Sequence, residues 1–525
     1  MILQFPTSSS AIPSLSFQEI AFLAGSFLLL SYLAQVLYNL FFHPLSKLPS
    51  AAPFAPANTW WSLWHGLVTQ DRVFLLHQKL EEVGPAVRYG PNEVVVSDPK
   101  YLKTIMMAKL DKTPASAGFT TNRGTPCAFS AIVNAEAAGK RKGMLPHYAT
   151  TNLQLWQPVF DEHIGHLVKV LEGYGPDESV DILSLGAHAI IDILGEIVLD
   201  KNIMSLNDYA RGIRNPITRA IALWPKRGMI KGNLPGWVWP IVEKFPNEWW
   251  QHLCRSDADL ADFVGPLVHD ARSRGTPDRP SLIHRLSNSV DSYIGQLWPV
   301  DHVISECIDH FLAGTETTSV TLAYCLYALS TCPGVMSKLQ AELDEAIPDP
   351  EAVISISVAQ NLPYLNAVVK EGEHEHDLHS VLHYAYSLRL FPASPGPKLR
   401  ILGNGLAVGD HFLPPGTVVG IPIWTTHRMA SIWGSDATTY RPERWIEGVS
   451  PEQNTAFQPF SLGGRSCPGM NLAMTDLRML ISMITRNFDI TPARQTTEAS
   501  MTPRDLETLY PIGGEVRLHF KSRSG

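Results

Sequence analysis

A single cysteine lies where a reactive thiol is expected. Residues 460–469 read FSLGGRSCPG and place Cys467 in a glycine-rich turn directly before Pro468. Proline suits the first turn of a helix, and apolar side chains recur at helical spacing in the residues that follow. Cys467 is therefore predicted at a helix N-terminus, where the dipole lowers a thiol pKa and favours the thiolate, the form that binds metals. The alternative is an inert, buried cysteine in a turn.

A hydroxyl and a carboxylate adjoin each other in a second segment. Residues 313–318 read AGTETT, within a run of helical periodicity from 302 to 329. The Thr317 hydroxyl beside the Glu316 carboxylate suits proton delivery to a reacting group. Taken alone the pattern is weak, because Thr-Glu-Thr is also common on solvated helix faces.

The composition is that of a globular protein without a nucleic-acid partner. Of 525 residues, 45% are hydrophobic and 18% are charged, and the formal net charge is -8. This acidic balance gives no electrostatic attraction for nucleic acid. The six cysteines are too sparse for a disulfide framework, so we expect them to be reduced, in a compartment that faces the cytosol.

An uncharged run near the N-terminus predicts a membrane anchor. Residues 20–42 are long enough for a helix that crosses a bilayer, which needs ~20 residues. A cleaved signal peptide is disfavoured, because no positive charge precedes the run and its length exceeds the usual ~7–15 apolar residues. Glu19 before the run and Lys47 after it favour a cytosolic main body. The predicted divisions are a lumenal tail (1–19), a single-pass anchor (20–42), a Pro-rich linker (43–58) and a catalytic domain (59–525).

The rest of the chain is predicted to be mainly helical. Helical periodicity dominates between residues 103 and 343. Residues 86–99 predict two short strands around a Gly-Pro turn, and residues 399–423 return to strand-like alternation. Residues 508–520 predict a closing hairpin around a Gly-Gly pair. The expected fold class is mainly α with small β-sheets and an N-terminal transmembrane helix.

The segment around Cys467 resembles the signature loop of the cytochrome P450 family of haem-thiolate monooxygenases. Every fixed position of the family pattern F-x-x-G-x-R-x-C-x-G is matched. The resemblance extends over essentially the whole chain. It implies the cytochrome P450 fold, haem b (iron protoporphyrin IX) as cofactor and Cys467 as the axial ligand of its iron. A thiolate ligand pushes electron density onto haem iron and favours O–O cleavage.

The resemblance also implies which residues hold the haem. Arg465 is expected to pair with a propionate, and Phe460 to pack on the sulfur side and limit water. Arg141 resembles the propionate-binding position of a basic helix, although Ala137 replaces the family's usual tryptophan. The other implied cofactor-binding residues are Gly463, Gly469 and Arg400.

The AGTETT segment is similar to the family's oxygen-binding helix. The similarity implies that Gly314 opens the helix for O₂ and that Glu316 and Thr317 relay protons to the bound oxygen. An intact Thr317 disfavours the branches of the family that rearrange peroxides and often lack this threonine.

The family's Glu-x-x-Arg clasp is split in this chain. Its expected members are Glu371 and Arg389, with Arg444 of the RPERW segment, but residues 373–387 look inserted between the first two. On one continuous helix the 18 positions between Glu371 and Arg389 span ~27 Å. Either the inserted segment loops out or the clasp is broken.

Three interpretations of residues 373–387 stay open. The first is an error in the gene prediction, such as a retained or misplaced splice junction. The second is a genuine loop insertion. The third is a His-rich metal site, because His379 and His383 have the spacing that puts two imidazoles on one helix face.

The implied reaction inserts one atom of O₂ into a hydrophobic small molecule. Electrons come from NADPH through a separate NADPH–cytochrome P450 reductase, with cytochrome b5 as an additional donor, because the chain has no flavin or nicotinamide motif. The likeness to microsomal members from filamentous fungi implies secondary-metabolite biosynthesis at the endoplasmic reticulum membrane, with the catalytic domain in the cytosol. The pocket is expected to be mostly apolar and lined by residues near 117–131, 215–250, 306–318, 393–397 and 510–514.

Two other functions remain as alternatives. A non-catalytic haem-binding relic accounts for a disrupted clasp, but not for the intact Cys467, Arg465 and Glu316. A haem isomerase that needs no reductase is disfavoured by Thr317. Turnover with a reductase, and its dependence on NADPH, separates these alternatives from a monooxygenase.

Overall fold

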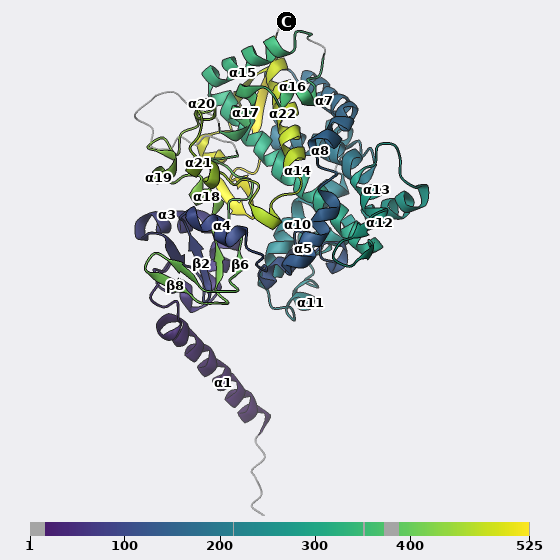
Figure 1. Ribbon diagram of the computed structural model, residues 1–525. Coiled ribbons are helices and arrows are strands. Elements are labelled where there is room, and N and C mark those ends of the chain that lie inside the picture. The colour runs from purple at the N-terminus through teal and green to yellow at the C-terminus, as the bar shows by residue number, and fades with distance from the viewer. Residues whose placement is uncertain (1–15, 214, 350–351, 372–387, 524–525) are drawn as a thin grey trace, which may run out of the picture.

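The protein is built around one long helix. The computed structural model describes residues 16–213, 215–349, 352–371 and 388–523. Helix α14 (Val300–Thr331) crosses the helical body, and most of the small sheets lie to one side of it (Figure 1). The mainly helical fold with small sheets is as predicted.

The helices account for most of the ordered structure. Short helices and turns connect the longer ones. The α-helices of six residues or more are α1 (Phe17–Leu37), α3 (Arg72–Val83), α4 (Lys100–Met106), α5 (Asn134–Met144), α7 (Gln157–Glu172), α8 (Ile182–Leu199), α9 (Ser205–Ala210), α10 (Pro216–Asn233), α12 (Glu248–Arg274), α13 (Leu282–Ser287), α14 (Val300–Thr331), α15 (Pro333–Ala346), α17 (Pro363–Lys370), α21 (Pro451–Ala456) and α22 (Met470–Asn487).

Helix α1 projects away from the rest of the protein (Figure 1). It begins at Phe17, ahead of the predicted span, because Ser16 and Glu19 form a capping box at its N-terminus. The helix continues as a π-helix to Phe42, and none of its apolar window is buried. It is therefore long and apolar enough to cross a membrane. Helix α8 has similar length and composition, but 83% of it is buried inside the protein, as for a core helix.

The predicted strands of two distant segments share one sheet. Strands β1 (Ala86–Arg88) and β2 (Glu93–Val96) pair antiparallel around the Gly-Pro turn. Strand β2 then pairs parallel with β9 (Val418–Gly420), which also pairs with β6 (Arg400–Ile401). The remaining short pairs are β7 (Leu406–Val408) with β8 (His411–Leu413) and β4 (Val290–Asp291) with β5 (Gln296–Leu297).

The predicted C-terminal hairpin is wrong. Strand β12 (Thr508–Pro511) pairs with β11 (Pro503–Leu506). Strand β13 (Arg517–Ser522) instead pairs with β10 (Phe488–Pro492) and β3 (Ser179–Asp181). The alternation of each strand is real, but a strand pattern does not specify its partner, and both strands find better-matched neighbours in other segments.

Helices α8 and α14 pack at close range through glycines. A Cβ added at Gly314 would lie 2.8 Å from Leu194 Cδ1, and one added at Gly186 would lie 3.0 Å from Leu322 Cδ2. A side chain at Gly314 would therefore have to displace the end of the Leu194 side chain on α8. Helix α14 is continuous through Gly314, and the opening of the helix for O₂ at this glycine stays a prediction.

Candidate active site

The loop that carries Cys467 is closed by its own backbone. The Cys467 N–H donates to the Phe460 carbonyl at 2.8 Å, and α22 begins shortly afterwards at Met470, as predicted. Gly463 has a φ of 75°, and a Cβ added there would lie 2.5 Å from the Met106 carbonyl oxygen. Gly463 is thus required by the turn and by its packing on the end of α4.

The Cys467 thiol lies deep in the protein but is not packed. Cys467 is accessible although its thiol is strongly desolvated, so we infer that it borders an internal space. Burial raises the pKa of the thiol to about 11, while the Gly469 N–H and Arg141 act in the opposite direction. The predicted lowering of this pKa is wrong for the free thiol, because desolvation outweighs the helix terminus. Coordination to a metal ion would deprotonate it outright.

Helix α14 presents its middle to an internal space as well. Ala313 is exposed, although Leu312 before it is only 3% exposed. The Thr317 hydroxyl donates to the Ala313 carbonyl at 2.7 Å, so both residues lie on one face. Asp309 on the same face raises the pKa of Cys467, which means that its charge acts on the thiol. We infer that α14 and the cysteine loop flank one space.

Helix α5 brings a cation to the loop. Arg141 donates from Nη1 to the Gly464 carbonyl at 2.8 Å and from Nη2 to Ser466 Oγ at 3.2 Å. Its Nε is buried and has no hydrogen-bond partner among the described residues. The Arg141 charge lowers the pKa of Cys467, so the guanidinium lies near the thiol, and its free Nε–H can donate to an anionic group.

Three more cations gather on one flank of the site. Burial lowers the pKa of Arg400 to about 10, and Arg465 contributes to the decrease. Lys112, which sequence reasoning missed, has a pKa lowered to about 7 by burial and by the charges of Arg400 and Arg465. An anion relieves such repulsion, and a haem carries anionic propionates. Arg465 also donates to the main-chain oxygens of Ala131 and Ile132, at 2.6 and 2.8 Å.

Glu316 is held by the C-terminal strands. The Tyr510 hydroxyl donates to Glu316 Oε1 at 2.7 Å, and the Thr508 hydroxyl donates to Oε2 at 3.4 Å. Burial raises the pKa of Glu316 to about 7, and these two hydrogen bonds oppose the rise. Neither partner was predicted from the sequence, because nothing local marks a residue 194 positions away as a neighbour.

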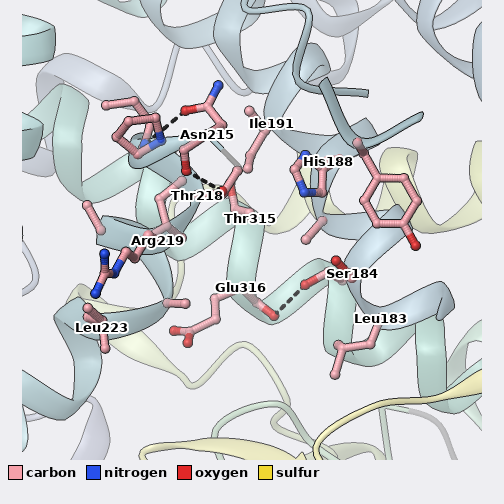
Figure 2. A pocket seen from close by; sticks show the side chains of 18 of the residues that line it. Leu183, Ser184, His188, Ile191, Asn215, Thr218, Arg219, Leu223, Thr315 and Glu316 are labelled. Carbon is pink, nitrogen blue, oxygen red and sulfur yellow. Dashed lines mark hydrogen bonds between the residues drawn. The ribbon is translucent and has the colours of Figure 1, made fainter. Parts of the chain in front are cut away.

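A cavity of about 1220 Å³ lies on the Glu316 side of α14. Figure 2 shows Thr315 and Glu316 on α14 facing this cavity together with His188 of α8 and Arg219 of α10. Its lining includes parts of the predicted segments 215–250, 306–318 and 510–514, but none of 117–131 or 393–397. As expected, its lining is mostly apolar, although Glu316, His188 and Arg219 contribute charged or titratable groups.

The split clasp is closed in this structure. Arg389 donates to both Glu371 oxygens, at 2.5 and 2.6 Å, and Arg444 Nε donates to Glu371 Oε1 at 3.0 Å. Trp445 Nε1 adds a fourth donor at 3.0 Å. Glu371 and Arg389 are both completely buried. All three predicted clasp residues therefore meet.

The chain returns beside the point at which it leaves α17. The Arg389 N–H donates to the Lys370 carbonyl at 3.1 Å, so a separation of 18 positions in sequence becomes direct contact. Of the two expected outcomes, the broken clasp is wrong. The predicted metal ligands His379 and His383 lie outside the described residues.

The clasp is linked to the cysteine loop through one histidine. His427 Nδ1 lies 2.8 Å from the Arg389 carbonyl, and the Gln458 N–H donates to His427 Nε2 at 2.9 Å. Burial lowers the pKa of His427 to about 3, so the ring is neutral, with Nδ1–H as donor and Nε2 as acceptor. Because Gln458 lies two residues before Phe460, the clasp fixes the start of the loop.

This geometry is that of a haem-thiolate protein. An accessible thiol ahead of a helix, a long helix opposite it and flanking cations match an iron porphyrin with acidic side groups. A family model for cytochrome P450 matches residues 54–513, and the chain belongs to this family. It is accordingly a monooxygenase, an oxidoreductase with a haem cofactor that uses O₂, a redox partner and a small-molecule substrate.

Several curated fungal proteins are similar over almost their whole length. Cytochrome P450 monooxygenase macH of Penicillium terrestre is 26% identical, over 92% of this chain and 94% of its own. Benzoate 4-monooxygenase bphA of Aspergillus niger is 26% identical, over 94% of this chain and 96% of its own. Cytochrome P450 monooxygenase pkfB of Emericella nidulans is 25% identical, over 84% and 85% respectively.

Removal of residues 373–387 is expected to leave the haem site unchanged. The reason is that Lys370 and Arg389 already touch through their backbones. The reduced, carbon-monoxide difference spectrum of the shortened protein should match that of the full chain in position and in amplitude per haem. A band that appears only after shortening would contradict the closed clasp in the full chain.

Replacement of Glu371 by Gln is expected to lower the free energy of unfolding by about 3–5 kcal/mol, because it leaves the buried Arg389 guanidinium without its carboxylate and Arg444 with Asp436 as its remaining carboxylate. Denaturant titration of the haem-loaded protein measures this change. The control is Glu345→Gln, an exposed site at which we expect a change within about 0.5 kcal/mol. Equal changes in the two variants would show that the clasp contributes no specific stability.

Proposed function

We propose that the protein is a membrane-anchored monooxygenase that hydroxylates a hydrophobic small molecule in secondary metabolism, with the Cys467 thiolate as the axial ligand of haem b. The observation that carries this proposal is the accessible Cys467 in the loop before α22, whose thiol is influenced by the charge of Asp309 on α14. When bound, the haem supplies oxygen activation, which a thiolate ligand favours. The names of the fungal relatives support the reaction class.

The cations around the site hold and orient the cofactor. Arg141 offers its unpartnered Nε–H, and Arg400 and Lys112 offer charges that repel each other until an anion binds between them. Arg465 contributes through its charge while it ties the loop to residues 131–132. Phe460 closes the loop through its carbonyl and belongs to the partly buried edge of the main core, which limits water at the sulfur.

Glu316 and Thr317 deliver protons to the oxygen side of the site. With a pKa near 7, Glu316 can take up and release a proton at physiological pH. Its carboxylate is fixed by Tyr510 and Thr508 and lines the 1220 Å³ cavity, from which water can reprotonate it. Thr317, one residue along α14, carries its hydroxyl on the Ala313 side. The two residues thus connect the cavity to the space above Cys467.

The anchor and an aromatic surface are proposed to lie at one membrane. Trp237 and Trp249 are 73% and 49% exposed, and α11 (Trp239–Val242) lies at the end of the molecule from which α1 leaves (Figure 1). Indole rings favour membrane interfaces. We place this surface at the cytosolic face of the endoplasmic reticulum, with NADPH–cytochrome P450 reductase as electron donor and cytochrome b5 as an additional donor.

A non-catalytic relic is the weaker alternative. The feature that favoured it was the split Glu-x-x-Arg motif. The closed contact between Glu371 and Arg389 removes that reason.

Replacement of Cys467 by Ser is expected to abolish the red-shifted Soret band of the reduced carbon-monoxide complex, because serine supplies no thiolate. The control is Cys254→Ser, a half-buried cysteine on α12, which should keep the full band. Retention of the band in Cys467→Ser would exclude this residue as the ligand.

The yield of product per NADPH is expected to fall as pH rises from about 6 to about 8, because the acid form of a group with a pKa of about 7 is lost over that range. Glu316→Gln should lower the yield by about tenfold or more and remove the pH dependence.

Tyr510→Phe should move the inflection of the yield to higher pH, because it removes a hydrogen-bond donor that stabilises the Glu316 carboxylate. The yield is measured with butylbenzene as substrate, as the product formed and the hydrogen peroxide released per NADPH consumed. A yield independent of pH in the unmodified enzyme would contradict the role of Glu316.

A further inference from the structure

Charged side chains line α14 ahead of its exposed middle. Glu306, Asp309 and His310 lie seven, four and three residues before Ala313, so they share its face of the helix. Their exposed fractions rise from 0% at Glu306 to 7% at Asp309 and 9% at His310. All three are buried, whereas Ala313, about one turn farther along the helix, is exposed.

Glu306 has a counter-ion of its own. Lys140 Nζ lies 3.3 Å from Glu306 Oε1, and the Ala128 N–H donates to the same oxygen at 2.9 Å. Lys140 also donates to the Pro126 carbonyl at 2.8 Å and lies 3.1 Å from His302 Nδ1. Burial raises the pKa of Glu306, and Lys140 opposes the rise. The ammonium group of Lys140 is thus fully engaged by Glu306 and its neighbours.

His310 is neutral and is engaged at both ring nitrogens. Its Nδ1 lies 2.7 Å from the Tyr148 hydroxyl, and its Nε2 lies 2.7 Å from Met144 Sδ. Burial lowers the pKa of the imidazole to about 4. His310 therefore gives no positive charge to this face at neutral pH.

Asp309 is the acid that remains without a cation in contact. Among the described residues it forms no ion pair with lysine, arginine or histidine, and the Cys127 thiol is its hydrogen-bond donor. Lys112 and Lys140 influence it from farther away. Burial raises its pKa to about 6, so the carboxylate is largely ionised at pH 7.5. A nearly buried carboxylate of this kind is stabilised strongly by a cation that enters from the open side.

We propose that Asp309 binds a basic nitrogen of the substrate, so that the enzyme selects amine-containing hydrophobic molecules. This inference rests on the proposed function. Asp309 lies four residues, or about 6 Å along the helix, before Ala313, which borders the space opposite Cys467. When Asp309 binds the protonated amine, the apolar part of the same molecule therefore lies beside the reaction space.

A metal ion is the alternative cation for the cluster of Glu306, Asp309 and His310. Ligand atoms of Glu306, Asp309 and His310 all lie within 4.8 Å of one another. A metal would have to displace Lys140 from Glu306 and Tyr148 or Met144 from His310, whereas an amine needs only Asp309. The existing contacts thus favour the organic cation.

The test compares two ligands of the same shape. N,N-dimethyl-4-phenylbutylamine is protonated at pH 7.5, and (5-methylhexyl)benzene is its neutral carbon isostere. Equilibrium dialysis against the ferric, haem-loaded protein gives the Kd of each. We expect Asp309→Asn to weaken binding of the amine tenfold or more and to change binding of the hydrocarbon less than twofold. Asp309→Glu, which keeps the charge, should keep the preference for the amine.

Control measurements separate the sources of failure. Asp259→Asn alters an acid that lines the cavity on the other side of α14 and should leave both Kd values unchanged. A loss of amine binding in Asp259→Asn but not in Asp309→Asn would overturn the proposal. So would stoichiometric Zn²⁺ binding that depends on Asp309, because the site would then be a metal site. Absence of the carbon-monoxide band in the unmodified protein would instead contradict the proposed function itself.

Discussion

The buried contact between Glu371, Arg389 and Arg444 is the constraint on which the cysteine loop depends. Charges that are fully removed from water are stable only when each one meets its partner and its remaining hydrogen bonds are filled. Arg389 meets this condition by donating to the carbonyls of His427 and Ala437 as well as to Glu371. It therefore holds the segment that leads to the loop, and the position of Cys467 follows from a contact at another place in the fold.

Helix α14 separates two environments with different tasks. Its Glu316 side borders a mostly apolar cavity that also contains charged groups, and its Ala313 side borders the space that we infer beside Cys467. Close packing against α8 at Gly314 holds the helix in place between them. A tightly held helix can thus present a carboxylate to the cavity and a threonine to the reaction space only one residue apart, because successive residues are turned by about 100°.

The sequence predicts the site well wherever chemistry is encoded in local spacing. The Cys467 loop, the helix with Glu316 and Thr317, and the strands at residues 86–99 all follow from short patterns. The clasp shows the limit, because a distance of ~27 Å between Glu371 and Arg389 holds only if one helix continues between them. The backbone hydrogen bond between Arg389 and Lys370 shows that no single straight helix joins them, so the two clasp residues can meet. Contacts such as Tyr510 with Glu316 are set by tertiary packing and leave no local signal.

Helix α5 joins the cofactor side of the site to the substrate side. Arg141 reaches the cysteine loop at Gly464 and Ser466, while the preceding residue, Lys140, reaches Glu306 on α14. Because neighbouring residues on a helix point in different directions, one turn of α5 supplies a cation to each side. Lys140 cannot serve Asp309 as well, since it is already shared by Glu306, Pro126 and His302. Asp309 therefore has no cation in contact because Lys140 of α5 pairs with Glu306 instead. Asp309 lies about one helical turn before the exposed Ala313.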